Sequence, residues 1–334
     1  MTPFRVHHIN SSTHRSPTFL ALFFVTSSLV PPLRAVDLPL ELPLWEKPPP
    51  DYVIREDVTE QVRTNKARPG SPSGKNRVFS SVTSATYSIH RPRNPNGVGV
   101  VICPGGAFRD VWLDREGHDL AIWLKDHNVT SLVLKYRTRL PNDNPSANAW
   151  LNYQGAVQAD GRQAIRILRK GTSDLKLDPD KIGICGFSAG GHLALTCSLT
   201  PEPKHPDTEV SGLPDFAGLF YPGIPDDVDE ILDGRLSLAG DASAICPFFI
   251  MNASIDRLTP ADKCIAFYAN LLKAGVKAEL HVFGKGSHGF DLGTGRGASA
   301  AIWPTSFIAW LKDTDVRDRQ EITWTFECPI APHL

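Results

Sequence analysis

One segment near the middle of the chain, residues 181–192, constrains the fold more than any other. It reads Lys-Ile-Gly-Ile-Cys-Gly-Phe-Ser-Ala-Gly-Gly-His and contains the pattern Gly-x-Ser-x-Gly. A short apolar run precedes this pattern and small residues follow it, so we expect a buried strand, a sharp turn and a helix. Side chains two residues before and after the serine would clash in such a turn, which accounts for Gly186 and Gly190. Ser188 would then stand at the tip with its hydroxyl exposed.

Apolar runs alternate with amphipathic segments over residues 78–312, and this order predicts an α/β fold with a doubly wound, mostly parallel sheet flanked by helices. Residues 78–90 suit one or two antiparallel strands. The other expected strands cover residues 98–103, 129–136, 181–186, 216–221, 246–252 and 276–283, and the expected helices cover 117–128, 156–170, 261–274 and 298–312. The hydrophobic content of 41% in 334 residues is enough to fill one large core.

The N-terminus has the pattern of a secretory signal peptide. Arg5 and Arg15 precede an apolar run at 19–25, which is too short to span a bilayer. We therefore predict a signal peptide at 1–35, a secreted or periplasmic protein and no stable membrane insertion; the alternative is a disordered extension. An extended, loop-rich segment is expected at 36–77, the α/β domain at 78–312 and a polar tail at 313–334.

Composition excludes several classes of function. The formal net charge is −1 and no basic stripe is present, which argues against binding to nucleic acid or to an anionic membrane surface. The six cysteines lack Cys-x-x-Cys spacing, so neither a zinc site nor a redox motif is expected, and Cys103, Cys185 and Cys246 are predicted to be small buried apolar residues. No phosphate-binding glycine motif occurs. We expect no metal and no cofactor.

A serine hydroxyl needs a base and a third group that orients the base. Among the histidines after Ser188, His288 stands in a glycine-flanked loop directly after an expected strand, where loops gather at the carboxyl edge of a parallel sheet. His192 lies one helical turn past the serine, and His281 lies within a strand. The alternative for His288 is an ordinary surface histidine.

The acid is expected between the serine and the histidine in the chain. Only Asp256 closely follows a buried strand. The acidic residues at 226–233 are interpreted as a solvated loop, and Asp262 as a first-turn helix residue. A surface aspartate is the alternative reading of Asp256.

Two backbone donors are needed for an oxyanion. One is the N–H of Ala189, the residue after the serine, and the other is expected from the loop Pro104-Gly105-Gly106-Ala107 after an earlier central strand. Gly106 and Ala107 are the candidate donors in that loop. An ordinary Pro-Gly-Gly turn is the alternative.

With these motifs in hand, the chain resembles the α/β-hydrolase superfamily and, more narrowly, exported bacterial carbohydrate esterases of the acetyl-xylan or feruloyl-esterase-like kind. The resemblance covers residues 78–312 and rests on 104–108, Glu116-Gly117, 134–137, 160–166, 186–192 and 286–290. It implies that Ser188, Asp256 and His288 are nucleophile, acid and base. Ala107-Phe108 stands where Gly-Tyr is usual, and the segment 253–257 matches the family pattern loosely.

The expected activity is hydrolysis of carboxylic esters through an acyl-enzyme, with deacetylation of a carbohydrate as the expected reaction. The loops 137–153 and 201–214 are rich in polar residues, with Trp150 and Tyr153 as isolated aromatics, and this combination favours a sugar over an apolar chain. Two alternatives remain: a peptidase or dienelactone-hydrolase-like enzyme on the same fold, and a non-catalytic carbohydrate-binding scaffold.

Overall fold

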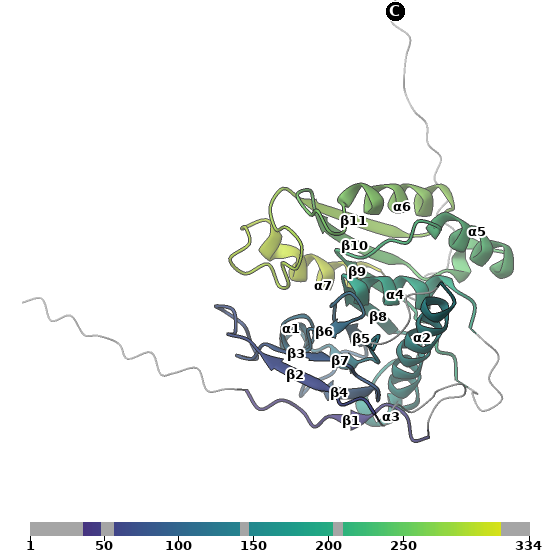
Figure 1. Cartoon of the computed structure of the whole chain (residues 1–334). Helices are drawn as coiled ribbons and strands as arrows, with labels where there is room; N and C mark the ends of the chain where they lie inside the picture. The colour runs from purple at the N-terminus through teal and green to yellow at the C-terminus, as the bar shows by residue number, and fades with distance from the viewer. Residues whose placement is uncertain (1–35, 48–56, 141–146, 203–209, 315–334) are drawn as a thin grey trace, which may run out of the picture. The chain divides into compact units, whose positions relative to one another are not determined.

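An eight-stranded sheet forms the centre of the computed structural model (Figure 1). The structure describes residues 36–47, 57–140, 147–202 and 210–314, without the side chains of 147–154. The strand order is β1-β4-β7-β5-β8-β9-β10-β11, in which the pairs β1–β4 and β4–β7 are antiparallel and all other neighbours are parallel. The strands are β1 (Leu42–Pro43), β4 (Thr86–His90), β5 (Gly99–Cys103), β7 (Thr130–Lys135), β8 (Ile182–Phe187), β9 (Ala217–Phe220), β10 (Phe248–Ala253) and β11 (Ala278–Phe283). The predicted α/β class with a mostly parallel sheet is confirmed.

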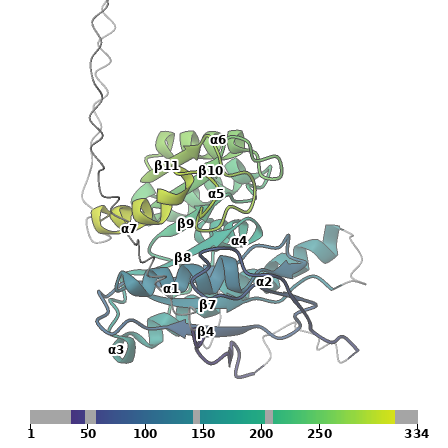
Figure 2. The same ribbon diagram turned by 90° about the vertical axis from the view of Figure 1, so that its left-hand side faces the viewer.

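Helices cover both faces of this sheet, as a doubly wound topology requires. They are α1 (Asp119–Asp126), α2 (Ala147–Lys170), α3 (Thr172–Leu175), α4 (Ala189–Leu199), α5 (Val228–Ala239), α6 (Ala261–Lys273) and α7 (Trp303–Asp313). Helices α1 and α7 lie on one face (Figure 2), and α2 and α4 pack together over the other. Helix α6 packs on β10 and β11 and contacts α5.

Strand β8 lies near the centre of the sheet, between β5 and β9, and carries Ser188 at its carboxyl end. All of its residues are buried. Gly183 leaves room for a neighbouring ring, because a Cβ there would lie 2.1 Å from a ring carbon of Phe216. Beneath the carboxyl end, Phe220 packs against Trp303 of α7 with ring centroids 4.5 Å apart. Because β8 also pairs with β5 along one edge and with β9 along the other, the strand that delivers the serine is held along both edges.

The segment 36–77, expected to be extended and loop-rich, contributes strands to two sheets. Strand β1 pairs with β4 at one edge of the main sheet. Strand β2 (Gln61–Thr64) pairs with β3 (Arg77–Ser80), and β3 pairs with β6 (Asp110–Val111), in a separate antiparallel sheet. The domain boundary at residue 78 stays a prediction, but strands on its N-terminal side pair with strands beyond it.

Two helical segments differ from the expectation. Helix α2 begins at Ala147, so the second half of the expected loop 137–153 is helical. The acidic segment 226–233 was expected to be a loop, and this is wrong from Val228 onward, where α5 begins. Val228 and Leu232 are buried one helical turn apart, and Asp229 and Glu230 lie in the first turn, where negative charge is favourable. The spacing of the two apolar residues therefore favours a helix, although the acidic residues around them suggested a loop.

The predicted signal peptide at 1–35 and the tail from 315 onward lie outside the described residues. Among the helices that are described, none combines the length and the apolar character that crossing a bilayer demands. Cys103 and Cys185 are buried, and Cys246 is half-buried. Cysteines 103, 185, 197, 246 and 264 are all free thiols.

A pair of buried histidines joins β4 to the turn before α1. The Nε2 atom of His90 lies 2.9 Å from Nδ1 of His118, and each residue is only 2% exposed. Burial disfavours the charged imidazolium, so the pKa of His90 is lowered to about 3 and that of His118 to about 4. Both rings are therefore neutral in the folded protein well below pH 6.

This pair predicts a loss of stability in mild acid. A histidine has a pKa near 6.5 when unfolded, so below that pH the unfolded chain binds protons that the folded chain does not, and stability falls as the pH drops toward about 4. The free energy of unfolding should decrease by about 2 kcal/mol per histidine between pH 7 and pH 5. Urea unfolding at pH 7, 6 and 5 measures this. The variant His90→Phe with His118→Leu should show a flatter pH dependence than the exposed-site control His127→Gln. An equal pH dependence in both variants would contradict the assignment.

Candidate active site

Ser188 stands on a sharp turn between β8 and α4. Its backbone angles are φ 53° and ψ −115°, a conformation that residues other than glycine rarely adopt. A Cβ on Gly186 would lie 2.1 Å from the carbonyl oxygen of Gly190, and one on Gly190 would lie 1.9 Å from that of Cys103. Both positions therefore require glycine, as the pattern in the sequence predicts.

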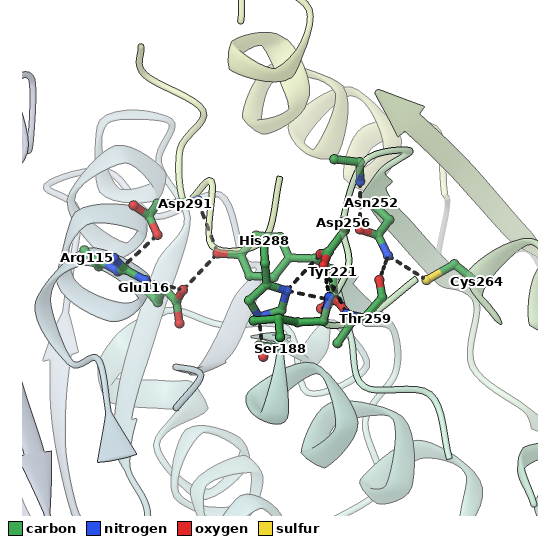
Figure 3. A network of polar contacts seen from close by, with 12 residues as sticks. Arg115, Glu116, Ser188, Tyr221, Asn252, Asp256, Thr259, Cys264, His288 and Asp291 are labelled. Carbon is green, nitrogen blue, oxygen red and sulfur yellow. Dashed lines mark hydrogen bonds and ion pairs between the residues drawn. The ribbon is translucent and has the colours of Figure 1, made fainter. Parts of the chain in front are cut away.

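His288 comes from the loop after β11 and reaches the serine. Its Nε2 atom lies 2.9 Å from Oγ of Ser188, across 100 residues of sequence (Figure 3). The loop turns sharply before the histidine, with positive φ at Gly286 (138°) and Ser287 (55°). The imidazole is 21% exposed at its side chain, so it is open to solvent on one side.

Asp256 follows β10 and lies behind the histidine. Its Oδ2 atom is 2.8 Å from Nδ1 of His288, and its side chain is fully buried. The Oδ1 atom accepts the backbone N–H groups of Leu258 and Thr259 at 2.9 and 3.0 Å. Burial raises the pKa of Asp256, but these bonds and the contact with His288 more than offset burial and hold the pKa below its usual value. The group is an ionised acceptor at neutral pH, able to orient the ring and to stabilise it when charged.

Thr259 belongs to this arrangement, although the sequence reasoning missed it. Its hydroxyl lies 2.9 Å from Oδ2 of Asp256, 3.1 Å from Nδ1 of His288 and 3.0 Å from the carbonyl oxygen of Tyr221. The spacing Asp-x-x-Thr before a helix is typical of a turn closed by side-chain to backbone bonds and is the signal that was available.

The loop after β5 lies against the serine. A Cβ on Gly105 would lie 2.9 Å from Cβ of Ser188 and 2.8 Å from the carbonyl oxygen of Phe187. Gly106, Ala107 and Phe108 all have positive φ, at 139°, 54° and 57°. In the described part of the chain, the N–H groups of Gly106, Ala107 and Ala189 have no hydrogen-bond acceptor. The N–H of Gly105, in contrast, donates to Glu116 at 2.8 Å.

The remaining candidates from the sequence have other roles. Nδ1 of His192 lies 3.0 Å from the carbonyl oxygen of Gly223, and His281 pairs with Glu279 at 2.6 Å. Asp160, in the segment 160–166 of the resemblance, pairs with Arg137 at 2.7 Å. His205, His333 and the side chains of Trp150 and Tyr153 lie outside the described residues.

The arrangement suits nucleophilic attack on a carbonyl group. A hydroxyl, an imidazole and a carboxylate form a continuous line of contacts, with unpaired N–H groups in the adjacent loop, which is the geometry needed to move a proton from the hydroxyl during attack on a carbonyl. Within residues 36–314 as described, no three His, Cys, Asp or Glu side chains gather in a way that could hold a metal ion.

Comparisons with known proteins agree with this fold. The BD-FAE family model matches residues 150–217, which include β8, Ser188 and α4. An acetylxylan esterase of Xylanibacter ruminicola is 31% identical over 224 residues, covering 61% of this chain and 43% of that protein. A probable carboxylic ester hydrolase, LipM, of Mycobacterium tuberculosis is 26% identical over 239 residues, covering 62% of this chain and 52% of that protein. The chain thus spans about half the length of these curated relatives.

Solved structures give the same architecture. An acetyl ester-xyloside bifunctional hydrolase from Caldicellulosiruptor lactoaceticus superposes with a TM-score of 0.58 at 24% identity, covering 83% of this chain and 97% of that one. The thermophilic esterase Est2 of Thermogutta terrifontis superposes with a TM-score of 0.55 at 23% identity, covering 76% and 97%. The chain therefore has the α/β-hydrolase fold that its motifs predict, and its sequence is similar to those of carboxylic ester hydrolases.

Proposed function

We propose that this protein is a serine esterase that cleaves carboxylic esters through an acyl-enzyme on Ser188. The observation that carries the proposal is the line of contacts from Ser188 through His288 to Asp256, at 2.9 and 2.8 Å. The similarity to an acetylxylan esterase and to a carboxylic ester hydrolase supports it.

In the proposed reaction, Oγ of Ser188 attacks the ester carbonyl while Nε2 of His288 takes the hydroxyl proton. Asp256 stabilises the imidazolium that forms. The histidine then gives its proton to the oxygen of the leaving alcohol, and the C–O bond of the ester breaks. Water, deprotonated by the same histidine, releases the acid and restores the serine.

The developing oxyanion would be bound by the backbone N–H groups of Ala189 and of Gly106 or Ala107. These groups have no acceptor within the described chain, and the loop that carries two of them is in contact with the serine. Ala107 holds a left-handed conformation that glycine, the usual residue of the family pattern, adopts without strain.

The substrate is proposed to be a short acyl ester, above all acetate, on a carbohydrate. The support comes from relatives that act on acetylated xylan or on acetyl ester and xyloside bonds. Secretion or export to the periplasm would bring the enzyme to such a polymer. A peptidase, a dienelactone hydrolase and a non-catalytic scaffold are the other candidates, and the experiments below separate them.

The first prediction concerns the nucleophile and the acid. Ser188→Ala should lower kcat by about four to six orders of magnitude, and Asp256→Asn by about three to four, because the imidazolium loses its partner. Hydrolysis of 4-nitrophenyl acetate and labelling by a fluorophosphonate probe measure both variants. Thermal unfolding should change little for Ser188→Ala. Substantial activity in Ser188→Ala, or an essential aspartate at 226–233 with a dispensable Asp256, would contradict the assignment.

The second prediction concerns the loop next to the serine. Gly105→Ala places a Cβ within 3 Å of three atoms, including Cβ of Ser188, so the loop must shift. Because displacements near 1 Å can cost about 100-fold in rate, kcat should fall about 10- to 100-fold. The matched control is Gly234→Ala in α5, where a Cβ meets nothing within 4 Å. This control should keep full activity and gain about 0.5–1 kcal/mol of stability. Equal activity of the two variants would argue against a catalytic role for the loop.

The third prediction concerns the substrate. The wild-type protein should release acetate from acetylated xylan and should hydrolyse aryl acetates with a higher kcat/KM than C8–C12 aryl esters. Acetate release followed by an enzymatic assay, with Ser188→Ala as the blank, is the measurement. Preference for the long chains without acetate release would assign the protein to the general carboxylesterases, and cleavage of peptides alone would favour the peptidase.

A further inference from the structure

We propose that Glu116 and Tyr221 form one positioning unit, which sets the oxyanion loop and the histidine relative to each other. This inference rests on the proposed esterase function. Neither residue touches the reacting atoms in the proposed reaction. Their contacts link the loop after β5, the turn after β9, the acid turn and the histidine (Figure 3).

Glu116 fixes the peptide that leads into the oxyanion loop. It is 2% exposed and lies in the π-helical turn η1 (Asp114–His118), which precedes α1. Its Oε2 atom accepts the N–H of Gly105 at 2.8 Å. The carbonyl oxygen of Gly105 accepts the N–H of Trp112 at 3.1 Å, and that of Pro104 accepts the hydroxyl of Tyr136 at 2.7 Å. The Gly105 peptide groups are held from several directions, so the N–H groups of Gly106 and Ala107 that follow have a set direction.

Tyr221 connects Glu116 to the other half of the site. Its hydroxyl donates to Oε1 of Glu116 at 3.0 Å and accepts the N–H of Asp291 at 3.2 Å. Its carbonyl oxygen accepts the hydroxyl of Thr259 at 3.0 Å, and its ring packs edge-on against His288 with centroids 5.2 Å apart. Tyr221 also has a positive φ of 37°, a strained conformation of the kind that persists where surrounding contacts hold it.

Two arginines lie beside the carboxyl groups of this unit. A lone carboxylate next to the oxyanion loop would oppose the negative charge that develops there. Arg115 lies 3.4 Å from Glu116 and 3.3 Å from Asp291, with its guanidinium 3.9 Å from the centre of the Trp112 ring. Asp291 also pairs with Arg68. Burial lowers the pKa of Arg115, but the two carboxylates outweigh burial and raise it, so the cation persists.

Tyr221 acts as a permanent donor in this unit. Burial, followed by the charge of Glu116, raises the pKa of its phenol well above the ordinary value. The hydroxyl therefore keeps its proton over the working pH range, and the bond to Glu116 persists. Loss of this bond should allow the loop and the histidine to move independently.

The unit should stabilise the transition state more than the bound substrate, because it orients the backbone N–H donors of the loop and His288, which interact with the charges that develop during the reaction. Glu116→Gln and Tyr221→Phe should each lower kcat about 10- to 100-fold, less than loss of a direct oxyanion donor. KM should stay within about threefold. Since the two residues act through one contact, the double variant should be far less impaired than the product of the single effects. Tyr221→Phe keeps the ring and its packing, so the experiment does not depend on the fold of the glutamate variant.

The affinity for a transition-state analogue distinguishes positioning from a purely structural role, because a purely structural role would leave this affinity unchanged. In an aryl trifluoromethyl ketone, Oγ of Ser188 bonds to the carbonyl carbon, the proton passes to His288, and the carbonyl oxygen becomes an anion. In Glu116→Gln, Tyr221→Phe and the double variant, the inhibition constant of this ketone should rise by the same factor by which kcat falls.

The matched control is Asp215→Asn. The Asp215 carboxylate accepts the N–H of Ile182 at 2.8 Å and pairs with Arg169 at 2.6 Å, at the far end of β8 from the serine. The Asp215→Asn variant should have a lower melting temperature than the wild type, with unchanged kcat and unchanged affinity for the ketone.

Different outcomes would overturn the positioning role of Glu116 and Tyr221 and the esterase function. Variants that lose thermal stability but keep kcat and ketone affinity would overturn the positioning role while the esterase assignment stands. The same holds if KM rises at constant kcat, or if the effects of the two substitutions multiply independently. A wild-type protein that hydrolyses no ester of the panel and does not react with a fluorophosphonate would overturn the proposed function and the positioning role with it.

Discussion

The backbone conformation of Ser188 is the constraint on which the rest of the site depends. A residue held at φ 53° and ψ −115° is strained by on the order of 1–3 kcal/mol. Backbone hydrogen bonds offset this cost. The N–H of Ser188 donates to the carbonyl oxygen of Phe220 in β9 at 2.9 Å, and its own carbonyl oxygen accepts the N–H groups of His192 in α4 and of Gly223 at 3.0 and 3.1 Å. The buried, central position of β8 makes these bonds available. A serine on an edge strand with no neighbour in the place of β9 would lack the two bonds to Phe220 and Gly223.

Parallel strands explain how residues far apart in sequence meet at this serine. The loops after β5, β9, β10 and β11 all leave the same edge of the sheet, and each brings one part: the glycine loop, Tyr221, Asp256 and His288. The geometry therefore depends on strand register as much as on the side chains. The aromatic packing of Phe220 on Trp303 beneath β9 contributes by holding α7 against the sheet.

The sequence allowed the fold class, most strands and the meeting of Ser188, Asp256 and His288 to be predicted, because these follow from apolar runs and from the rule that loops gather at one sheet edge. The supporting residues could not be predicted. Glu116 was noted only as part of a resemblance, because its bond to Gly105 depends on a π-helical turn, a rare element that the apolar spacing of the sequence did not indicate. Tyr221 was expected only as the end of a strand. Helix α5 was missed because its buried positions, Val228 and Leu232, lie among acidic residues that suggested a loop.

The contact of Arg68 with the histidine loop has a consequence for how the protein is made. Its guanidinium donates to the carbonyl oxygen of Gly289 at 3.0 Å and pairs with Asp291, which is 223 residues further along the chain. During translation the N-terminal partner is synthesised long before the other, so the loop that bears His288 cannot be secured until nearly the whole domain has been synthesised. Contacts of such high sequence separation form late and slow the folding of parallel sheets. A nascent chain that ended before residue 288 would have the serine elbow without the histidine, and one that ended at 288–290 would have the histidine without the Asp291 contact. The three side chains can therefore be held together only after nearly the whole domain has been synthesised.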